Sequence, residues 1–152
     1  MKHSLSVIFC VFFIFHSLAS SNSSAENDGN GNPHPTGNKM RIKVGTKTFA
    51  ATLYDNATAT AFKSLLPMTV NMVDLNGNEK YFDLPDNLPT NASNPRTIQS
   101  GDLMIYGSNT LVLFYKTFAT SYSYTKLGRI NDTEGFAATV GSENVTVTYE
   151  LE

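Results

Sequence analysis

The chain has 152 residues, a formal net charge of −2 at pH 7 and one cysteine, Cys10. It has no basic stretch of the kind that binds nucleic acid or anionic lipid, so partners of these classes are not expected. The three histidines are at positions 3, 16 and 34. Residues 38–152 therefore lack the side chains for cysteine or histidine nucleophiles and histidine-ligated metals, and we expect no metal and no cofactor.

The N-terminus has the pattern of a secretory signal peptide. Lys2 gives a positive start, an apolar run extends over 5–15, and small residues follow at 17–19. The run is short for a membrane span. We predict a signal peptide over 1–19 with cleavage after Ala19, or alternatively after Ala25. The protein should then be secreted or periplasmic, with no membrane span after cleavage.

The next segment, 20–37, is rich in Ser, Asn and Gly and contains two prolines. A segment of this composition buries little apolar surface, so it is predicted to be a flexible linker. The remaining residues, 38–152, are numerous enough for one domain with a hydrophobic core.

A hairpin and a helix are predicted at the start of this domain. Apolar and polar residues alternate over 40–44, and Gly45-Thr46-Lys47 predicts a turn into a strand at 48–54. Asp55 or Asn56 can then cap a short amphipathic helix that Pro67 ends. Its apolar residues have helical spacing; they are Ala59, Phe62, Leu65 and Leu66.

A second hairpin and a long loop follow. Asn76-Gly77-Asn78 predicts a turn between strands at 68–74 and 79–84. The polar stretch 85–100 contains three prolines and predicts a long loop, which is either functional or a mobile connection.

The most apolar part of the chain is a third hairpin, with strands at 103–106 and 110–116. Leu111, Leu113 and Tyr115 share one face of the second strand, while Val112 and Phe114 share the other. Apolar residues on both faces indicate a strand that is covered on both sides, as at the centre of a barrel capped by helices.

A strand at 122–130, a short helix near 133–140 and a final strand from Val145 complete the predicted elements. About eight strands and two short helices predict a mainly β fold, a closed antiparallel barrel.

The order of these elements resembles that of the cyclophilins, and several short stretches are similar. "IQSGD" (98–102) resembles their Gln-Gly-Gly-Asp stretch, and "GSNTLVLF" (107–114) resembles their Gly-Ser-Gln-Phe-Phe-Ile strand. "LGRINDTEGFAATVG" (127–141) resembles their Phe-Gly-Lys-Val segment with its following helix. The resemblance implies a cyclophilin-like barrel.

Over residues 40–152 the chain resembles a family of small bacterial cyclophilin-like domains still more closely. The shared features include a Gly-Asp-x-x-x-Tyr strand (Gly101, Asp102 and Tyr106), an apolar "LVLFY" strand and "LGRI" at 127–130. Membership of this family implies the fold and no established reaction.

A cyclophilin-type prolyl isomerase would need an apolar pocket and an arginine that donates to the substrate. By the family's spacing, the arginine position falls at Asn91, the pocket phenylalanine at Leu111 and the histidine near Tyr124. The cyclophilin catalytic set is therefore not preserved, and a divergent isomerase would have to use Arg96 or Arg129 as its donor.

Tyrosines cluster around the central strands, where their rings could stack on a ligand and their hydroxyls could form hydrogen bonds, although most aromatic residues serve packing. No residue is assigned a catalytic role. The candidate binding residues are Arg96, Tyr106, Asn109, Thr110, Leu111, Tyr124 and Arg129.

We therefore expect an exported, monomeric, non-enzymatic cyclophilin-like domain that binds a peptide or small ligand in a concave face of the barrel. Two alternatives come from other classes: a divergent peptidyl-prolyl isomerase, and an accessory domain that docks on a partner protein. An isomerase would need the Arg96 guanidinium to point into the pocket beside Leu111. A large exposed apolar patch would favour docking.

Overall fold

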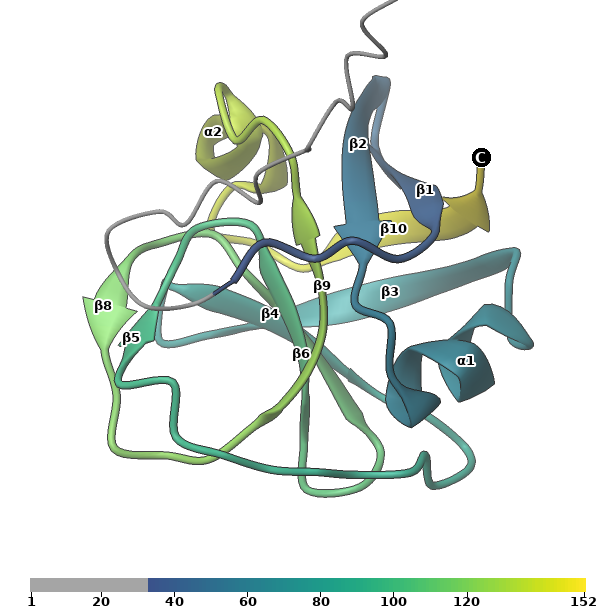
Figure 1. Cartoon of the computed structure of the whole chain (residues 1–152). Helices are drawn as coiled ribbons and strands as arrows, with labels where there is room; N and C mark the ends of the chain where they lie inside the picture. The colour runs from purple at the N-terminus through teal and green to yellow at the C-terminus, as the bar shows by residue number, and fades with distance from the viewer. Residues whose placement is uncertain (1–32) are drawn as a thin grey trace, which may run out of the picture.

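The computed structural model describes residues 33–152, and these form a closed barrel of eight antiparallel strands with two short helices (Figure 1). Around the barrel the strand order is β1–β10–β3–β4–β7–β6–β9–β2. The predicted mainly β fold, with its closed antiparallel barrel and two short helices, is confirmed. The predicted signal peptide (1–19) and most of the predicted linker (20–37) lie outside the described residues.

The barrel strands are accompanied by a small two-stranded sheet, β5–β8, at the left of Figure 1. The bounds of the elements are β1 Lys39–Val44, β2 Lys47–Leu53, α1 Ala57–Lys63, β3 Met68–Leu75, β4 Glu79–Asp83, β5 Thr97–Ile98, β6 Asp102–Tyr106, β7 Thr110–Phe114, β8 Phe118–Ala119, β9 Thr125–Ile130, α2 Phe136–Val140 and β10 Val145–Leu151.

The helices form where the sequence predicts them and pack against the interior of the barrel. Asn56 is the N-cap of α1, and its side-chain oxygen accepts a hydrogen bond from the Ala59 N–H at 2.8 Å. Phe62 of α1 packs edge-on against Tyr149, with ring centroids 5.9 Å apart. Phe136 of α2 is fully buried, so each helix contributes an aromatic side chain to the core.

The two faces of β7 belong to two separate apolar clusters. Leu111 and Leu113 point into the barrel and join its main core. Val112 and Phe114 point outward and join a second cluster with residues of β5, β6 and the chain around β8. The prediction that this strand is covered on both faces is confirmed, but β5 and the segment 116–124 cover the outer face in place of a helix. Both helices are too short for this, and their aromatic residues are used in the main core.

The segment before β9 differs from its predicted course for the same reason. A strand was expected over 122–130, whereas β9 begins at Thr125. The preceding residues run across the outer face of the barrel, and Tyr124 is buried there against Phe114, with ring centroids 5.5 Å apart. A backbone bridge also joins Tyr124 to Ser93 of the long loop.

A buried ion pair ties the β3–β4 hairpin to the end of β7. The Lys80 ammonium is fully buried, 2.8 Å from a carboxylate oxygen of Asp74, and it also donates to the carbonyl of Glu143 at 2.6 Å. The Tyr115 hydroxyl donates to the same Asp74 oxygen at 2.7 Å. The hydrogen bonds from Lys80 and Tyr115 lower the pKa of Asp74, while burial and the Asp74 bond raise the pKa of Tyr115 to about 12.

We expect Asp74→Asn to lower the free energy of unfolding by about 2–4 kcal/mol, because the buried Lys80 ammonium would lose its carboxylate partner. Tyr115→Phe, which removes one hydrogen bond and keeps the ion pair, should cost about 1 kcal/mol. Urea denaturation of both variants at neutral pH measures the difference. Equal, small losses would contradict an anchoring role for the ion pair.

Candidate functional site

Side chains that point outward from three neighbouring strands form the floor of a pocket. Tyr81 of β4 pairs with Val112 of β7. Asp83 of β4 pairs with Thr110 of β7, and Thr110 also pairs with Tyr106 of β6. Because alternate residues of a strand point to opposite sides of the sheet, these five side chains lie on one face, outside the barrel.

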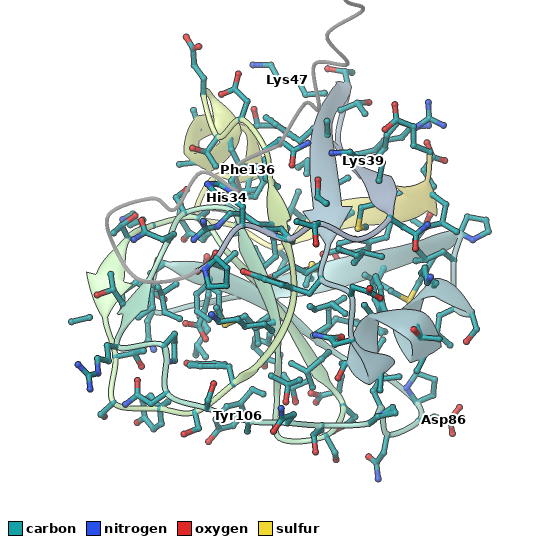
Figure 2. The ribbon with its side chains drawn as sticks, in the orientation of Figure 1. His34, Lys39, Lys47, Asp86, Tyr106 and Phe136 are labelled. Atoms are coloured by element: carbon teal, nitrogen blue, oxygen red, sulfur yellow. The ribbon has the colours of Figure 1, made fainter. Side chains whose placement is uncertain are left out.

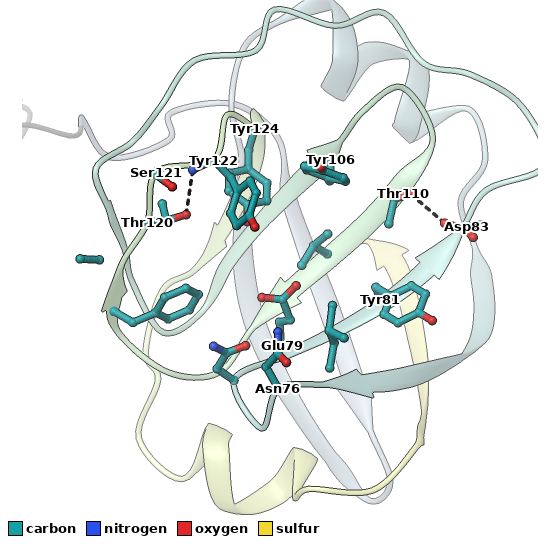
Figure 3. Close-up of a pocket in the computed structure, with 15 residues that line it drawn as sticks. Asn76, Glu79, Tyr81, Asp83, Tyr106, Thr110, Thr120, Ser121, Tyr122 and Tyr124 are labelled. Atoms are coloured by element: carbon teal, nitrogen blue, oxygen red, sulfur yellow. Dashed lines mark hydrogen bonds between the residues drawn. The ribbon is translucent and has the colours of Figure 1, made fainter.

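The segment 118–122 and Tyr124 form the wall of this pocket (Figure 3). The pocket has a volume of about 510 Å³, which lies within the usual range for small-ligand sites. Tyr106, one of its lining residues, lies at the end of the molecule opposite Phe136 (Figure 2). The lining residues belong to the β3–β4 hairpin, β6, β7 and the wall: Leu75, Asn76, Asn78, Glu79, Tyr81, Asp83, Tyr106, Thr110, Val112, Phe118, Ala119, Thr120, Ser121, Tyr122 and Tyr124.

Three tyrosine rings stand at steep angles to one another at one side of the pocket. Tyr106 is edge-on to Tyr122, with centroids 6.3 Å apart and an interplanar angle of 89°. It is tilted by 53° against Tyr124 at 5.7 Å. Tyr106 and Tyr122 remain 48% and 62% exposed, so their rings are available to a ligand. Tyr124 is buried and packs against both Tyr106 and Phe114.

Carboxylates give the pocket its charge. Glu79 points outward from β4 and is half-buried, and burial followed by the negative charge of Asp74 raises its pKa. The Tyr124 hydroxyl lies within reach of this charge, and its pKa is raised first by burial and then by Glu79. Asp83, at the other end of β4, accepts a hydrogen bond from the Thr110 hydroxyl at 2.7 Å. Within residues 33–152, no Lys, Arg or His lines the pocket.

Three of the seven predicted binding residues line this pocket: Tyr106, Thr110 and Tyr124. Two others lie elsewhere. Leu111 is fully buried in the main core, because it is one residue out of phase with the outward face of β7. Asn109 donates from its side chain to the carbonyl of Leu84 at 2.9 Å and holds the β6–β7 turn against the end of β4.

The two predicted arginines are also outside the pocket. Arg96 is exposed on the long loop, with a positive φ of 65°. Arg129 is buried on β9, where its Nε lies 2.9 Å from a carboxylate oxygen of Asp102. Burial is the main cause that raises the pKa of Asp102, and the second Asp102 oxygen accepts from the Gln99 N–H at 2.8 Å. This pair has a structural role at the β6–β9 seam.

The sequence prediction of the site does not include β4 or the wall residues 118–121. The signal for β4 was present, because Glu79, Tyr81 and Asp83 alternate along a strand that the sequence predicts. No comparable signal marks the wall residues 118–121, which contact the pocket only because the chain folds back over β7.

The closed antiparallel barrel of eight strands with two short helices is consistent with a cyclophilin-like protein. A family model described as the cyclophilin-like family matches residues 42–150, so the chain belongs to this family, as its sequence motifs predict. The solution structure of a hypothetical protein from Archaeoglobus fulgidus has a similar fold, with a TM-score of 0.53 and 17% sequence identity. The similarity covers 78% of this chain and 98% of that protein. A comparison with curated proteins finds no match.

Neither helix of the described chain has the length and hydropathy of a membrane-spanning segment. Within the same residues, no group of three or more histidine, cysteine or carboxylate side chains is arranged to hold a metal ion.

We expect Glu79→Gln to raise the midpoint temperature of unfolding at neutral pH. Because the pKa of Glu79 is raised in the folded state, there is a pH range in which the folded protein still holds a proton that the unfolded chain has lost. As the pH rises through this range, the carboxyl group lowers the free energy of unfolding. The gain should shrink as the pH falls to about 4 and below, where the unfolded state also becomes protonated. Thermal unfolding at the two pH values checks this. Glu134→Gln, at an exposed site, is the matched control, and equal shifts in both variants would contradict the assignment.

Proposed function

We propose that this protein is an exported binding domain that holds a peptide or small ligand in the pocket on the outer face of β4, β7 and β6. The observation that carries the proposal is the pocket itself. It combines exposed aromatic rings, several hydroxyl groups and two carboxylates in a hollow of ligand size. A surface that served packing alone would have no need to leave Tyr106 and Tyr122 exposed.

The distribution of exposed apolar side chains also supports a pocket ligand. Of the five large hydrophobic residues that are exposed in the described chain, three line the pocket: Leu75, Tyr106 and Tyr122. Val73 is next to them, because it pairs with Tyr81 of the pocket floor. The apolar surface is therefore centred on the hollow, and it does not form a separate flat patch of the kind that favours docking on a partner.

The isomerase alternative has less support. Its donor was expected to be Arg96 beside Leu111, but Leu111 faces the barrel interior and Arg96 does not line the pocket. Arg129 already contacts Asp102. A reaction that lowers the rotation barrier of a peptide bond needs an oriented donor at the bond, and the described lining residues include no guanidinium.

Export is proposed from the sequence pattern of residues 1–19. After export, the folded barrel would lie outside the cytoplasm, with residues 20–37 as its N-terminal extension. We propose that it is a monomer there.

Ligand binding can be tested by a fragment screen that follows backbone amide signals by NMR. We expect fragments that bind to shift the signals of Val112 and Tyr122, on opposite sides of the pocket. Ser121→Trp should abolish these shifts by filling the hollow, whereas Ser123→Trp, in the same loop but outside the lining, should leave them unchanged. A library without any such fragment would refute the proposed function.

Export can be tested by mass spectrometry of the protein recovered from the medium or periplasm. We expect a mature chain that begins at Ser20, or at Glu26 if the alternative site is used. Recovery of the full-length chain from the cytoplasm alone would contradict export.

A further inference from the structure

The charged side chains in the described lining of the pocket are all negative. Its described lining includes Glu79 and Asp83 and no cationic side chain. The cations closest in sequence are directed elsewhere. Lys80, which follows Glu79, points into the barrel and is bound to Asp74, and Lys116 lies over the Tyr115 ring, 6.0 Å from its centroid.

Glu79 is the most unusual of these carboxylates. Its carboxylate forms no hydrogen bond or ion pair with any described residue, although it is half-buried and close to the negative charge of Asp74. Burial of an unpaired carboxylate beside a like charge is unfavourable for folding. Groups in such positions are frequently part of a functional site, where a ligand supplies the missing partner.

The exposed tyrosines of the same pocket offer a second attraction for positive charge. The faces of aromatic rings carry partial negative charge, and rings inclined to one another can surround a cationic group. Tyr106 and Tyr122 are edge-on to each other and exposed, and Figure 3 shows the Glu79 carboxylate directed toward this tyrosine side of the pocket.

An unpaired amide oxygen in the pocket matches a ligand that donates hydrogen bonds. The side-chain oxygen of Asn78 is buried without a hydrogen-bond partner in the described chain, and Asn78 lines the pocket. A primary ammonium or a guanidinium group donates several hydrogen bonds and accepts none, so it complements an amide oxygen and a carboxylate.

We propose that the pocket recognises an organic cation, an ammonium or guanidinium group, held between the Tyr106 and Tyr122 rings and the Glu79 carboxylate. This assignment rests on the proposed ligand-binding function and names its ligand class. The apolar body of such a ligand has Leu75 and Val112 to pack against.

A bare metal ion fits these residues less well than an organic cation. Glu79 and Asp83 are four residues apart on one strand, on the order of 13 Å along its axis. A divalent metal ion needs several oxygen ligands within about 2.5 Å. One ion therefore cannot use both carboxylates, whereas an extended ligand can contact each end of the pocket.

The first test isolates the positive charge: it compares choline, whose quaternary nitrogen has no N–H donors, with its neutral isostere 3,3-dimethylbutan-1-ol, in which carbon replaces the charged nitrogen. NMR titrations of the purified protein should show choline shifting the Val112 and Tyr122 signals. Its affinity should exceed that of the isostere by about tenfold. Glu79→Gln should weaken choline binding about three- to tenfold, while Glu134→Gln, which changes the net charge equally, should not weaken it.

A second pair of probes distinguishes a free cation from a peptide side chain. Acetyl-Gly-Arg-Gly-amide is compared with the same peptide containing neutral citrulline. Tighter binding of the arginine peptide than of choline supports a peptide as the source of the cation, and the reverse order supports a small free cation. Either result requires the charged probe to bind better than its neutral counterpart.

Equal affinities for the charged and neutral probes, or unchanged choline binding in Glu79→Gln, would overturn the cation assignment. Failure of both charged probes to shift the pocket signals would also overturn it. The proposed ligand-binding function would survive these results if neutral or anionic fragments from the screen still bound and Ser121→Trp abolished their shifts. Thermal unfolding of Glu79→Gln, measured under the titration conditions, separates loss of binding from loss of the fold.

Discussion

The structure depends on one constraint: β7 carries apolar side chains on both faces. Barrel closure buries only the inner face, with Leu111 and Leu113. Exposure of the outer face would leave Val112 and Phe114 in water, at a cost of about 1.5–3 kcal/mol for each large side chain. The chain around β5 and β8 packs against Phe114, Val112 is only 2% exposed, and this face continues as the pocket floor to the less buried Thr110. The pocket therefore results from incomplete covering of a strand that needs two covers.

Much of the barrel could be predicted from the sequence, because its signals are local. Strand alternation at Met40, Ile42 and Val44, the Asn76-Gly77 turn and the Asn56 cap each depend on neighbouring residues alone. The outer cover could not be predicted in this way. Tyr124 sits where its ring meets Phe114 and its backbone meets Ser93, and such distant contacts leave no periodic pattern in the segment.

The pocket shows the same division between local and distant signals. Tyr106 and Thr110 could be predicted because they flank the turn 107–109 between β6 and β7, which is recognisable in the sequence. Leu111 was misplaced by one residue, which on a strand means the opposite face. Arg96 and Arg129 both have the chemistry of a donor, but their sequence positions do not indicate that one is on an exposed loop and the other is bound to Asp102.

The buried Lys80–Asp74 pair has a consequence for the sign of the pocket. Glu79 and Lys80 are adjacent, so a slip of β4 by one residue would exchange their faces. The slip would put an unpaired carboxylate into the apolar interior and an ammonium among the tyrosines, which would make the pocket basic. The ion pair makes this alternative register costly. The Lys80–Asp74 ion pair inside the barrel thus fixes the register of β4, and with it the sign of the charge on the outer face.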